Sequence, residues 1–194
     1  MKSLLGTGAV DLEDSSVIAH ARMAGGPVDV AVLASALRRA SFSLCGSVAN
    51  GAITWICPAQ YVEQVALPAL RSAATAAGRE PPPLIMHVPV ALSTDVDAVR
   101  AAMRERYAFY VRVPNYSTMF AQAGFPEAKD GRWTDAMIDA VAVYGTETAV
   151  AERLRGLLAT GVDELLVSAV GVGPDAPASA QRVLRLIGEL SLRS

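Results

Sequence analysis

The chain has 194 residues, of which 52% are hydrophobic and 19% are charged, and its formal net charge is −2. That composition supports one sizeable folded core and excludes a disordered chain. The 17 Lys and Arg residues are spread along expected helices without forming a patch, so nucleic acid is not an expected partner.

Neither the N-terminus nor the apolar runs indicate a membrane protein. The longest uncharged apolar runs, such as 31–37 and 84–92, are far shorter than the ~20 residues of a membrane span. The first six residues carry one charge and two leucines, which is too little for a signal peptide. We therefore expect a cytoplasmic protein in which Cys45 and Cys57 are free thiols.

Residues 1–27 show no sustained hydrophobic period and are rich in glycine, so we expect an irregular leader with at most one short strand at 17–19. The pattern changes at Val28, where 28–34 is a nearly continuous run of β-branched and small apolar residues. Such a run predicts a strand buried on both faces, as in a parallel sheet. We place the folded domain at 28–194.

Strands and helices alternate along the rest of the chain. This alternation predicts an α/β fold with right-handed crossovers, either a doubly wound open sheet or a segment of a (β/α)8 barrel. The expected elements are a helix over 41–48, a strand over 51–56, a helix over 58–77, a strand over 84–92, a helix over 93–112, a helical region over 117–142, a helix between Thr146 and Gly161, a strand over 162–168 and a closing helix that contains 183–187.

Local catalytic motifs are absent: the chain has no Gly-x-Gly-x-x-Gly after a strand, no P-loop, no Gly-x-Ser-x-Gly and no paired-cysteine metal spacing. Gly171 and Gly173 follow the last strand, and their backbone could either approach a phosphate or form a simple turn. Barrel ligands bind at the carboxyl ends of strands, which keeps the first interpretation open.

Three further positions could carry chemistry. His87 points either into a barrel interior or into the helix layer, and it is either a hydrogen-bonded core residue or a base. Trp55 ends a strand and leads into a helix N-terminus, so it either contacts an anion or ring ligand or covers the rim of the core. Asp163 and Glu164 begin a strand and are interpreted as structural, while His20 is interpreted as solvated.

A family resemblance rests on several segments in a fixed order. Leu33–Leu37 is followed by Leu44–Ile53, whose Gly-Ser-Val-Ala-Asn-Gly core is similar to Gly-Glu-x-Ala-Asp-Gly. Over 28–190 the chain resembles the C-terminal half of the luciferase-like monooxygenases. The other segments that carry the resemblance are 76–79 before the prolines, 88–90 leading to 94–95, 144–146 before 149–154, and 161–164.

The resemblance implies the last four strands of a TIM (β/α)8 barrel. It also implies an oxidoreductase that uses coenzyme F420, with FMN as the alternative and binding of neither in this fragment as a third possibility. It names no catalytic proton donor and no metal ligand. The positions that it implies for cofactor binding are Ser35, Ala36, Thr54, Trp55, Cys57, Gly171, Gly173 and Arg182.

The barrel comparison also implies partners. A four-strand parallel sheet leaves two edges and one face open, so we expect a homo-oligomer or a complementary half-barrel. The substrate would be a small molecule of unspecified structure. The alternative function is a non-catalytic remnant or assembly module that oligomerises or pairs with another half-barrel.

Overall fold

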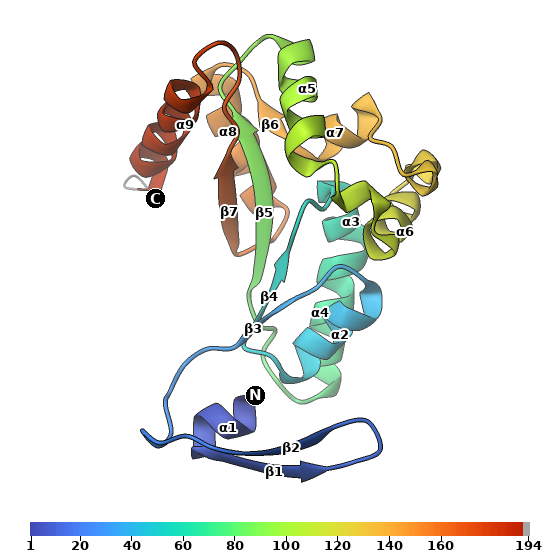
Figure 1. Cartoon of the computed structure of the whole chain (residues 1–194), viewed down its shortest axis with the longest axis vertical. Coiled ribbons are helices and arrows are strands. Elements are labelled where there is room, and N and C mark those ends of the chain that lie inside the picture. The colour runs from blue at the N-terminus through green and yellow to red at the C-terminus, as the bar shows by residue number, and fades with distance from the viewer. Residues whose placement is uncertain (192–194) are drawn as a thin grey trace. The chain divides into compact units, whose positions relative to one another are not determined.

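The computed structural model describes residues 1–191, which form two compact units divided after Leu33 (Figure 1). The first unit has a short helix, α1 (Lys2–Thr7), and an antiparallel hairpin of β1 (Ala9–Glu13) and β2 (Ile18–Arg22). Apart from Gly8, every residue of this unit is half-buried or exposed. The hairpin therefore has no core of its own.

The structure corrects two expectations near the N-terminus. Residues 1–27 are more regular than expected, because backbone pairing alone makes a hairpin there in the absence of an apolar period. The expected strand over 28–34 is wrong in extent: only β3 (Leu33–Ser35) forms, and residues 28–32 belong to no strand. β3 pairs only with β4 (Gly51–Thr54) within the described residues. At this edge of the sheet β4 is the one neighbouring strand, and it is only four residues long, so β3 stays short.

The second unit alternates strands and helices in nearly the expected order. Its strands after β3 and β4 are β5 (Leu84–Ala91), β6 (Val143–Tyr144) and β7 (Glu164–Ala169). Its helical elements are α2 (Arg39–Val48), α3 (Ala59–Tyr61), η1 (Val62–Ala66), α4 (Leu67–Ala76), α5 (Val96–Tyr107), η2 (Tyr110–Arg112), α6 (Pro114–Gln122), η3 (Pro126–Asp130), α7 (Asp135–Val141), α8 (Glu147–Ala159) and α9 (Ala176–Ser191).

The strands β3, β4, β5 and β7 are neighbours in chain order, with the short β6 beside the end of β5, and this order decides between the two predicted architectures. β4 pairs in parallel with β5, and β5 pairs in parallel with β7 along most of its length. The two-residue β6 joins only the end of β5. A doubly wound sheet reverses its strand order at a switch point, whereas a barrel adds each β/α unit beside the previous one. The parallel β/α units of a (β/α)8 barrel are therefore confirmed.

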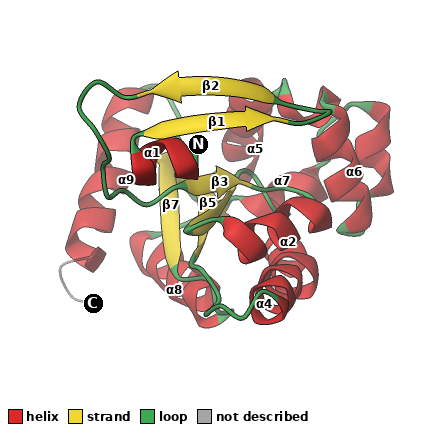
Figure 2. Ribbon diagram, turned by 90° about the horizontal axis from the view of Figure 1, so that it is seen from below, coloured by secondary structure: helices red, strands yellow, loops and turns green. Residues whose placement is uncertain are grey.

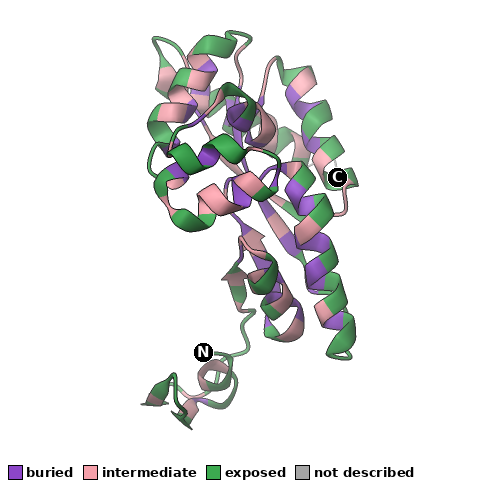
Figure 3. Cartoon of the chain, turned by 90° about the vertical axis from the view of Figure 1, so that its right-hand side faces the viewer, coloured by how far each residue is buried: buried purple, intermediate pink, exposed green. Residues whose placement is uncertain are grey.

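Three helices, α4, α8 and α9, cover one side of this sheet. Figure 2 shows α4, α8 and α9 on the same side of the strands, and Leu165 and Val167 of β7 line a groove with α8 and α9. Their register partners on β5, Met86 and Val88, are buried. We call this the helix-facing side. Figure 3 shows buried residues concentrated along these strands and the adjoining helix faces.

The predicted helix over 58–77 is one helical run that changes type midway. α3 leads into the π-helical turn η1, and α4 then continues to Ala76. Pro68 lies in the first turn of α4. Because proline has no N–H and its ring clashes with the carbonyl four residues earlier, a wider turn before it relieves the conflict.

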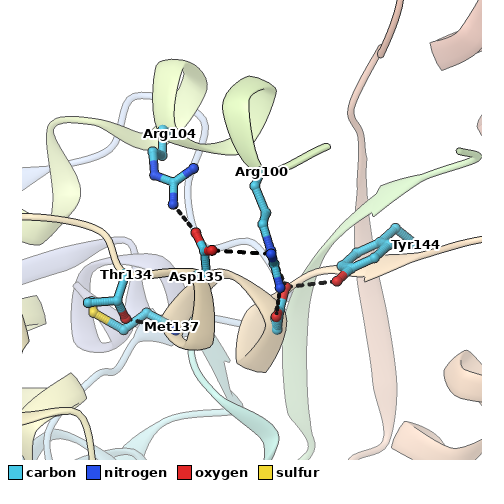
Figure 4. A network of polar contacts seen from close by, with 7 residues as sticks. Arg100, Arg104, Thr134, Asp135, Met137 and Tyr144 are labelled. Carbon is cyan, nitrogen blue, oxygen red and sulfur yellow. Dashed lines mark hydrogen bonds and ion pairs between the residues drawn. The ribbon is translucent and has the colours of Figure 1, made fainter. Parts of the chain in front are cut away.

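Side-chain caps and ion pairs define the helices of the region 93–146. Asp95 caps α5 and Thr146 caps α8, both as expected, through hydrogen bonds from the amides of Ala98 and Ala149. Figure 4 shows Arg100 and Arg104 of α5 bound to Asp135 of α7, while Arg100 also binds Asp139 at 2.5 Å. Hydrogen bonds from Arg100 hold the pKa of Asp139 below its ordinary value. The network fixes α7 against α5.

Two simpler expectations can be checked directly. Cys45 and Cys57 are buried free thiols. No helix among residues 1–191 is both long enough and apolar enough to cross a membrane.

Candidate functional site

The side of the sheet opposite α4, α8 and α9 carries the candidate site. Strand register places His87 beside Leu166 and Pro89 beside Ser168, on positions that alternate with the helix-facing residues. Ile53 and Ile85 share the same side one layer earlier. We call it the lumen-facing side, because it corresponds to the interior of a barrel. His87 therefore points toward the barrel interior and not into the helix layer.

His87 is completely buried and hydrogen-bonded at both ring nitrogens. Its Nδ1 accepts the backbone N–H of Ile56 at 3.3 Å, and its Nε2 lies 2.8 Å from Ser168 Oγ. Since Nδ1 acts as the acceptor, the neutral ring carries its proton on Nε2 and donates it to Ser168. Burial, helped by the positive charge of Arg106, lowers the pKa of His87 to about 4.

This hydrogen-bonding pattern defines what His87 can do. A ring that already donates from Nε2 cannot remove a proton from the Ser168 hydroxyl, so the pair is not a nucleophile and its base. The ring instead holds Ser168 Oγ as an acceptor, so the hydroxyl proton of Ser168 can be donated either to the neighbouring Tyr107 hydroxyl or to a bound group. Ser168 is half-buried near the carboxyl end of β7.

A strained turn positions Trp55 against His87. Ile56 has φ 51°, in the left-handed region, and it is the one residue other than glycine with positive φ among residues 1–191. A β-branched residue is rarely found there. The turn puts the Trp55 ring parallel to His87, with centroids 3.6 Å apart and an interplanar angle of 17°. Strain of this kind is concentrated at functional sites, which makes the turn a marker for one.

Tyrosines surround this stacked pair. Tyr107, at the end of α5, meets His87 edge-on at 6.3 Å between centroids, and Tyr110 lies 6.4 Å from Trp55. Tyr116 packs edge-on against Tyr110 at 5.0 Å. Burial raises the pKa of Tyr107, and it raises that of Tyr116 to about 12. The phenols of Tyr107 and Tyr116 are therefore neutral hydrogen-bonding groups at ordinary pH.

The three residues expected to bind a cofactor at the end of β4 do not all lie on the same side of the sheet. Trp55 is half-buried beside His87, and its indole Nε1 is buried without a hydrogen-bond partner. Thr54 is the register partner of Met86 and is completely buried on the helix-facing side. Cys57 is also fully buried, with its Sγ 3.9 Å from Met119 Sδ, and burial raises its pKa. Of these three, only Trp55 joins the lumen-facing cluster.

The remaining expected positions lie along the other strand ends. Ala36 is buried after β3, and Ser35 is exposed. Gly171 needs its missing side chain, because a Cβ there would lie 2.2 Å from the carbonyl oxygen of Ala176. Gly173 has φ 85° and open space around it, and Arg182 is exposed on α9.

A small cavity of about 230 Å³ adjoins the Gly171 turn. It is lined by Val170 and Gly171 after β7 and by Ala102, Glu105 and Arg106 of α5. Its volume is below the 300 Å³ or so of a small-molecule pocket, so it fits an end group and not a whole cofactor. Arg106 supplies a guanidinium, the group that matches phosphate geometry best.

Sequence reasoning did not find Ile56, Ser168 and Arg106 as site residues. Ser168 is the last residue of the predicted strand over 162–168 and matches no catalytic motif, so only the pairing of β7 with β5 reveals its contact with His87. The structural role expected for Asp163 agrees with its carboxylate, which accepts the backbone N–H of Leu84 at 2.8 Å.

Comparisons with known proteins agree with this architecture. A family model described as luciferase-like monooxygenase matches residues 13–164. The structure is similar to an F420-dependent secondary alcohol dehydrogenase in complex with an F420-acetone adduct, with a TM-score of 0.73 and 14% identity over 97% of this chain and 58% of that chain. A search of curated proteins finds no match.

Two further solved structures show the same fold. One is coenzyme F420-dependent tetrahydromethanopterin reductase from Methanopyrus kandleri, with a TM-score of 0.66 and 21% identity over 94% of this chain and 58% of that one. The other is the oxygenating constituent of 3,6-diketocamphane monooxygenase from Pseudomonas putida in complex with FMN, with a TM-score of 0.61 and 19% identity over 96% and 58%.

The three solved structures extend beyond the part that this chain matches. The chain spans 58% of the length of each of these three structures. Identities of 14–21% support a shared fold and not a shared activity. The family match is independent of them and extends over more than half of the chain. The protein belongs to the luciferase-like monooxygenase family.

Proposed function

We propose that this chain binds a deazaflavin cofactor as part of a luciferase-like oxidoreductase, with coenzyme F420 preferred and FMN as the alternative. The observation that carries the proposal is the stack of the half-buried Trp55 on the buried His87, held by Ile56 and Ser168 at the carboxyl end of the parallel strands. One similar structure holds an F420-acetone adduct, and another holds FMN. The family itself includes oxidoreductases and monooxygenases.

The described residues fit such a group in two places. The buried Nε1 of Trp55 is a donor without a partner, and an aromatic wall beside such a donor suits a planar heterocycle. Arg106 and the Gly171 turn suit an anionic end group. When bound, the cofactor supplies hydride transfer, while the protein supplies orientation and exclusion of water.

Each side chain has a separate part in this proposal. Trp55 bounds the ring and offers its N–H, His87 keeps Trp55 and Ser168 in place, and Ser168 offers its hydroxyl proton. Because the pKa of His87 is lowered to about 4, its ring stays neutral and adds no positive charge next to the bound group at ordinary pH. Arg106 holds the negatively charged end.

Titration of the chain with oxidised F420 and, separately, with FMN tests the proposal by cofactor fluorescence. We expect tighter binding of F420. Trp55→Leu should weaken binding about threefold to tenfold, and Trp55→Phe should weaken it less, because an aromatic pair contributes about 0.5–1.5 kcal/mol. Arg106→Ala should weaken it at least about tenfold through loss of a charge-assisted hydrogen bond.

Two arginines of α9 provide a further test of cofactor binding and its control. Arg182→Ala tests the position that the family resemblance implies, and Arg185→Ala is the matched control, since both side chains are exposed on the same helix. A loss confined to Arg106→Ala would move the phosphate contact from α9 to α5. No binding of either cofactor would contradict the proposal and favour the non-catalytic assembly module.

A further inference from the structure

The hydroxyl of Tyr107 is a buried donor that the fold itself does not use. Tyr107 ends α5 and is 3% exposed, and its hydroxyl makes no hydrogen bond of ordinary length and angle within residues 1–191. Its backbone is fixed, because Trp133 Nε1 donates to the carbonyl oxygen of Tyr107 at 2.9 Å. A buried donor without a partner costs stability, so such a group requires an explanation.

Two polar side chains lie beside this hydroxyl. Burial raises the pKa of Tyr107, and the nearby Arg106 and Ser168 oppose that rise. The guanidinium carbon of Arg106 lies 5.8 Å from the centre of the Tyr107 ring. Ser168 is half-buried on β7, whereas the Tyr107 hydroxyl is enclosed. Of the two hydroxyl groups, Ser168 is therefore the one that a bound molecule can reach.

The contact with His87 decides what Ser168 can offer. One lone pair of Ser168 Oγ accepts the Nε2 proton of His87 at 2.8 Å. A hydroxyl has one proton and two lone pairs, so Ser168 keeps one proton to give and one lone pair to fill. When the proton goes to a bound oxygen, the lone pair can accept the Tyr107 proton. The neighbouring Trp55 Nε1 is also a donor without a partner among the described residues, so the cluster suits an acceptor.

We propose that Ser168 gives its proton to an oxygen of the substrate and that Tyr107 replaces that proton. The substrate class follows from these donors, because the oxygen must accept a hydrogen bond and then become basic. Hydride addition to an aldehyde or ketone does this, since it puts a negative charge on the carbonyl oxygen. The inference rests on the proposed function for the hydride, and it adds a proton path that the family resemblance does not name.

Atoms and charges balance along this path. The carbonyl carbon gains a hydride from the reduced deazaflavin, so a C–H bond forms, the C=O π bond breaks, and two electrons leave the cofactor with the hydride. The oxygen takes the Ser168 proton, Ser168 takes the Tyr107 proton, and the alcohol is released. The positive charge of Arg106 stabilises the tyrosinate, which recovers its proton from water.

Binding of a plain ketone tests the contact with Ser168 without any cofactor. The probe is cyclohexanone labelled with 13C at the carbonyl, observed by difference infrared spectroscopy with the full chain. We expect the carbonyl stretch to move to lower wavenumber on binding, because a hydrogen bond polarises the C=O bond. Ser168→Ala should abolish this shift and weaken binding about threefold to tenfold. Tyr107→Phe should keep the shift.

Ketone reduction with reduced F420 tests the proton path itself, followed by the absorbance of the oxidised cofactor. Ser168→Ala should lower kcat at least about a hundredfold, the usual contribution of a positioned proton donor. Tyr107→Phe should lower kcat about tenfold to a hundredfold with KM unchanged, since it removes the second proton and not the contact with substrate. Ser168→Thr retains a hydroxyl and should keep most of the activity.

Melting temperatures separate this role from a structural one. Tyr107→Phe removes a hydroxyl without a partner, so the melting temperature should stay the same or rise. Tyr144→Phe is the matched control. Its hydroxyl donates to Asp139 at 2.7 Å, so this variant should melt at a lower temperature and still keep the infrared shift and kcat.

The outcomes decide separate points. No infrared shift, or a shift that Ser168→Ala keeps, would overturn the contact with Ser168 whether or not F420 binds. An unchanged kcat in Tyr107→Phe, or loss of the infrared shift in that variant, would overturn the relay. Failure of both cofactors to bind would contradict the proposed function and remove the hydride on which the relay depends, while the infrared result would still decide the contact.

Discussion

The two sides of the sheet differ in burial toward the amino ends of β5 and β7, although they alternate along the same strands. On β5, Leu84, Met86 and Val88 face the helices and are buried to within 1%. On the other side, Ile85 is only half-buried, and its neighbouring layer includes the exposed Leu166. Residue type does not explain the contrast, since both sides carry branched aliphatic residues. What differs at this end is the presence of a covering layer, because farther along β5 the lumen-facing His87 and Pro89 are buried.

The comparison separates stability from chemistry. The helix-facing side holds the apolar core, and burial of apolar surface is the main source of folding free energy. The lumen-facing side holds the neutral His87, the strained Ile56 and the unpartnered Trp55 Nε1. Buried polar groups and backbone strain cost stability, so their presence around Trp55 and His87 agrees with the binding site proposed there.

The largest expected effect on the free energy of unfolding comes from replacing one leucine on each side of the sheet with alanine. Leu84→Ala should lower the free energy of unfolding by about 2–5 kcal/mol, because the removed side chain leaves a cavity in a packed core. Leu166→Ala should lower it by less than about 1 kcal/mol in the monomer, since the side chain is already partly in water. Urea unfolding of the two variants measures the difference. Equal losses would show that the lumen-facing side is packed in solution.

A smaller effect is expected from two helical glycines. Gly46 lies where α2 crosses α4, and a Cβ there would lie 2.2 Å from the carbonyl oxygen of Leu70. Gly46→Ala should therefore destabilise by about 1–3 kcal/mol, as overpacking does. Gly156 on α8 has open space around it, so Gly156→Ala should stabilise by about 0.5–1 kcal/mol through better helix propensity. If the two substitutions changed the free energy of unfolding in the same direction, close packing of α2 against α4 would be refuted.

The fold was predictable where a single periodic pattern spans a whole element. The runs that became β5 and β7 and the caps Asp95 and Thr146 are local signals, and the parallel α/β order follows from their sequence. β6 was missed because two residues are too short to show a period. The strand over 28–34 was overestimated, since local propensity cannot report whether a neighbouring strand is present.

The candidate site was less predictable because it depends on contacts far apart in the chain. Trp55 was anticipated from its place at a strand end, but its stacking on His87 requires β4 and β5 to be paired. The His87–Ser168 hydrogen bond joins residues 81 positions apart. The strain at Ile56 depends on a backbone angle that no local motif specifies. Register, not residue type, determines that Thr54 faces away from the cluster.

The last prediction concerns His87, which is polar and completely buried on the lumen-facing side. The pKa of His87 is about 4 in the folded chain, against an ordinary value of 6.5, so the unfolded chain binds the extra proton between these values. Its contribution to stability is complete above pH 6.5 and is lost as the pH falls toward 4. The free energy of unfolding should therefore drop by at most about 1.4 kcal/mol per pH unit in that window.

One variant isolates this slope in urea unfolding between pH 4 and 7. His87→Phe keeps a ring against Trp55 but cannot bind a proton, so the slope due to His87 should vanish. It should also cost about 1–3 kcal/mol at neutral pH, because the Ile56 N–H loses its acceptor. If His87→Phe kept the full slope, His87 would be protonating freely in the folded chain, and the neutral ring assigned to the site would be wrong.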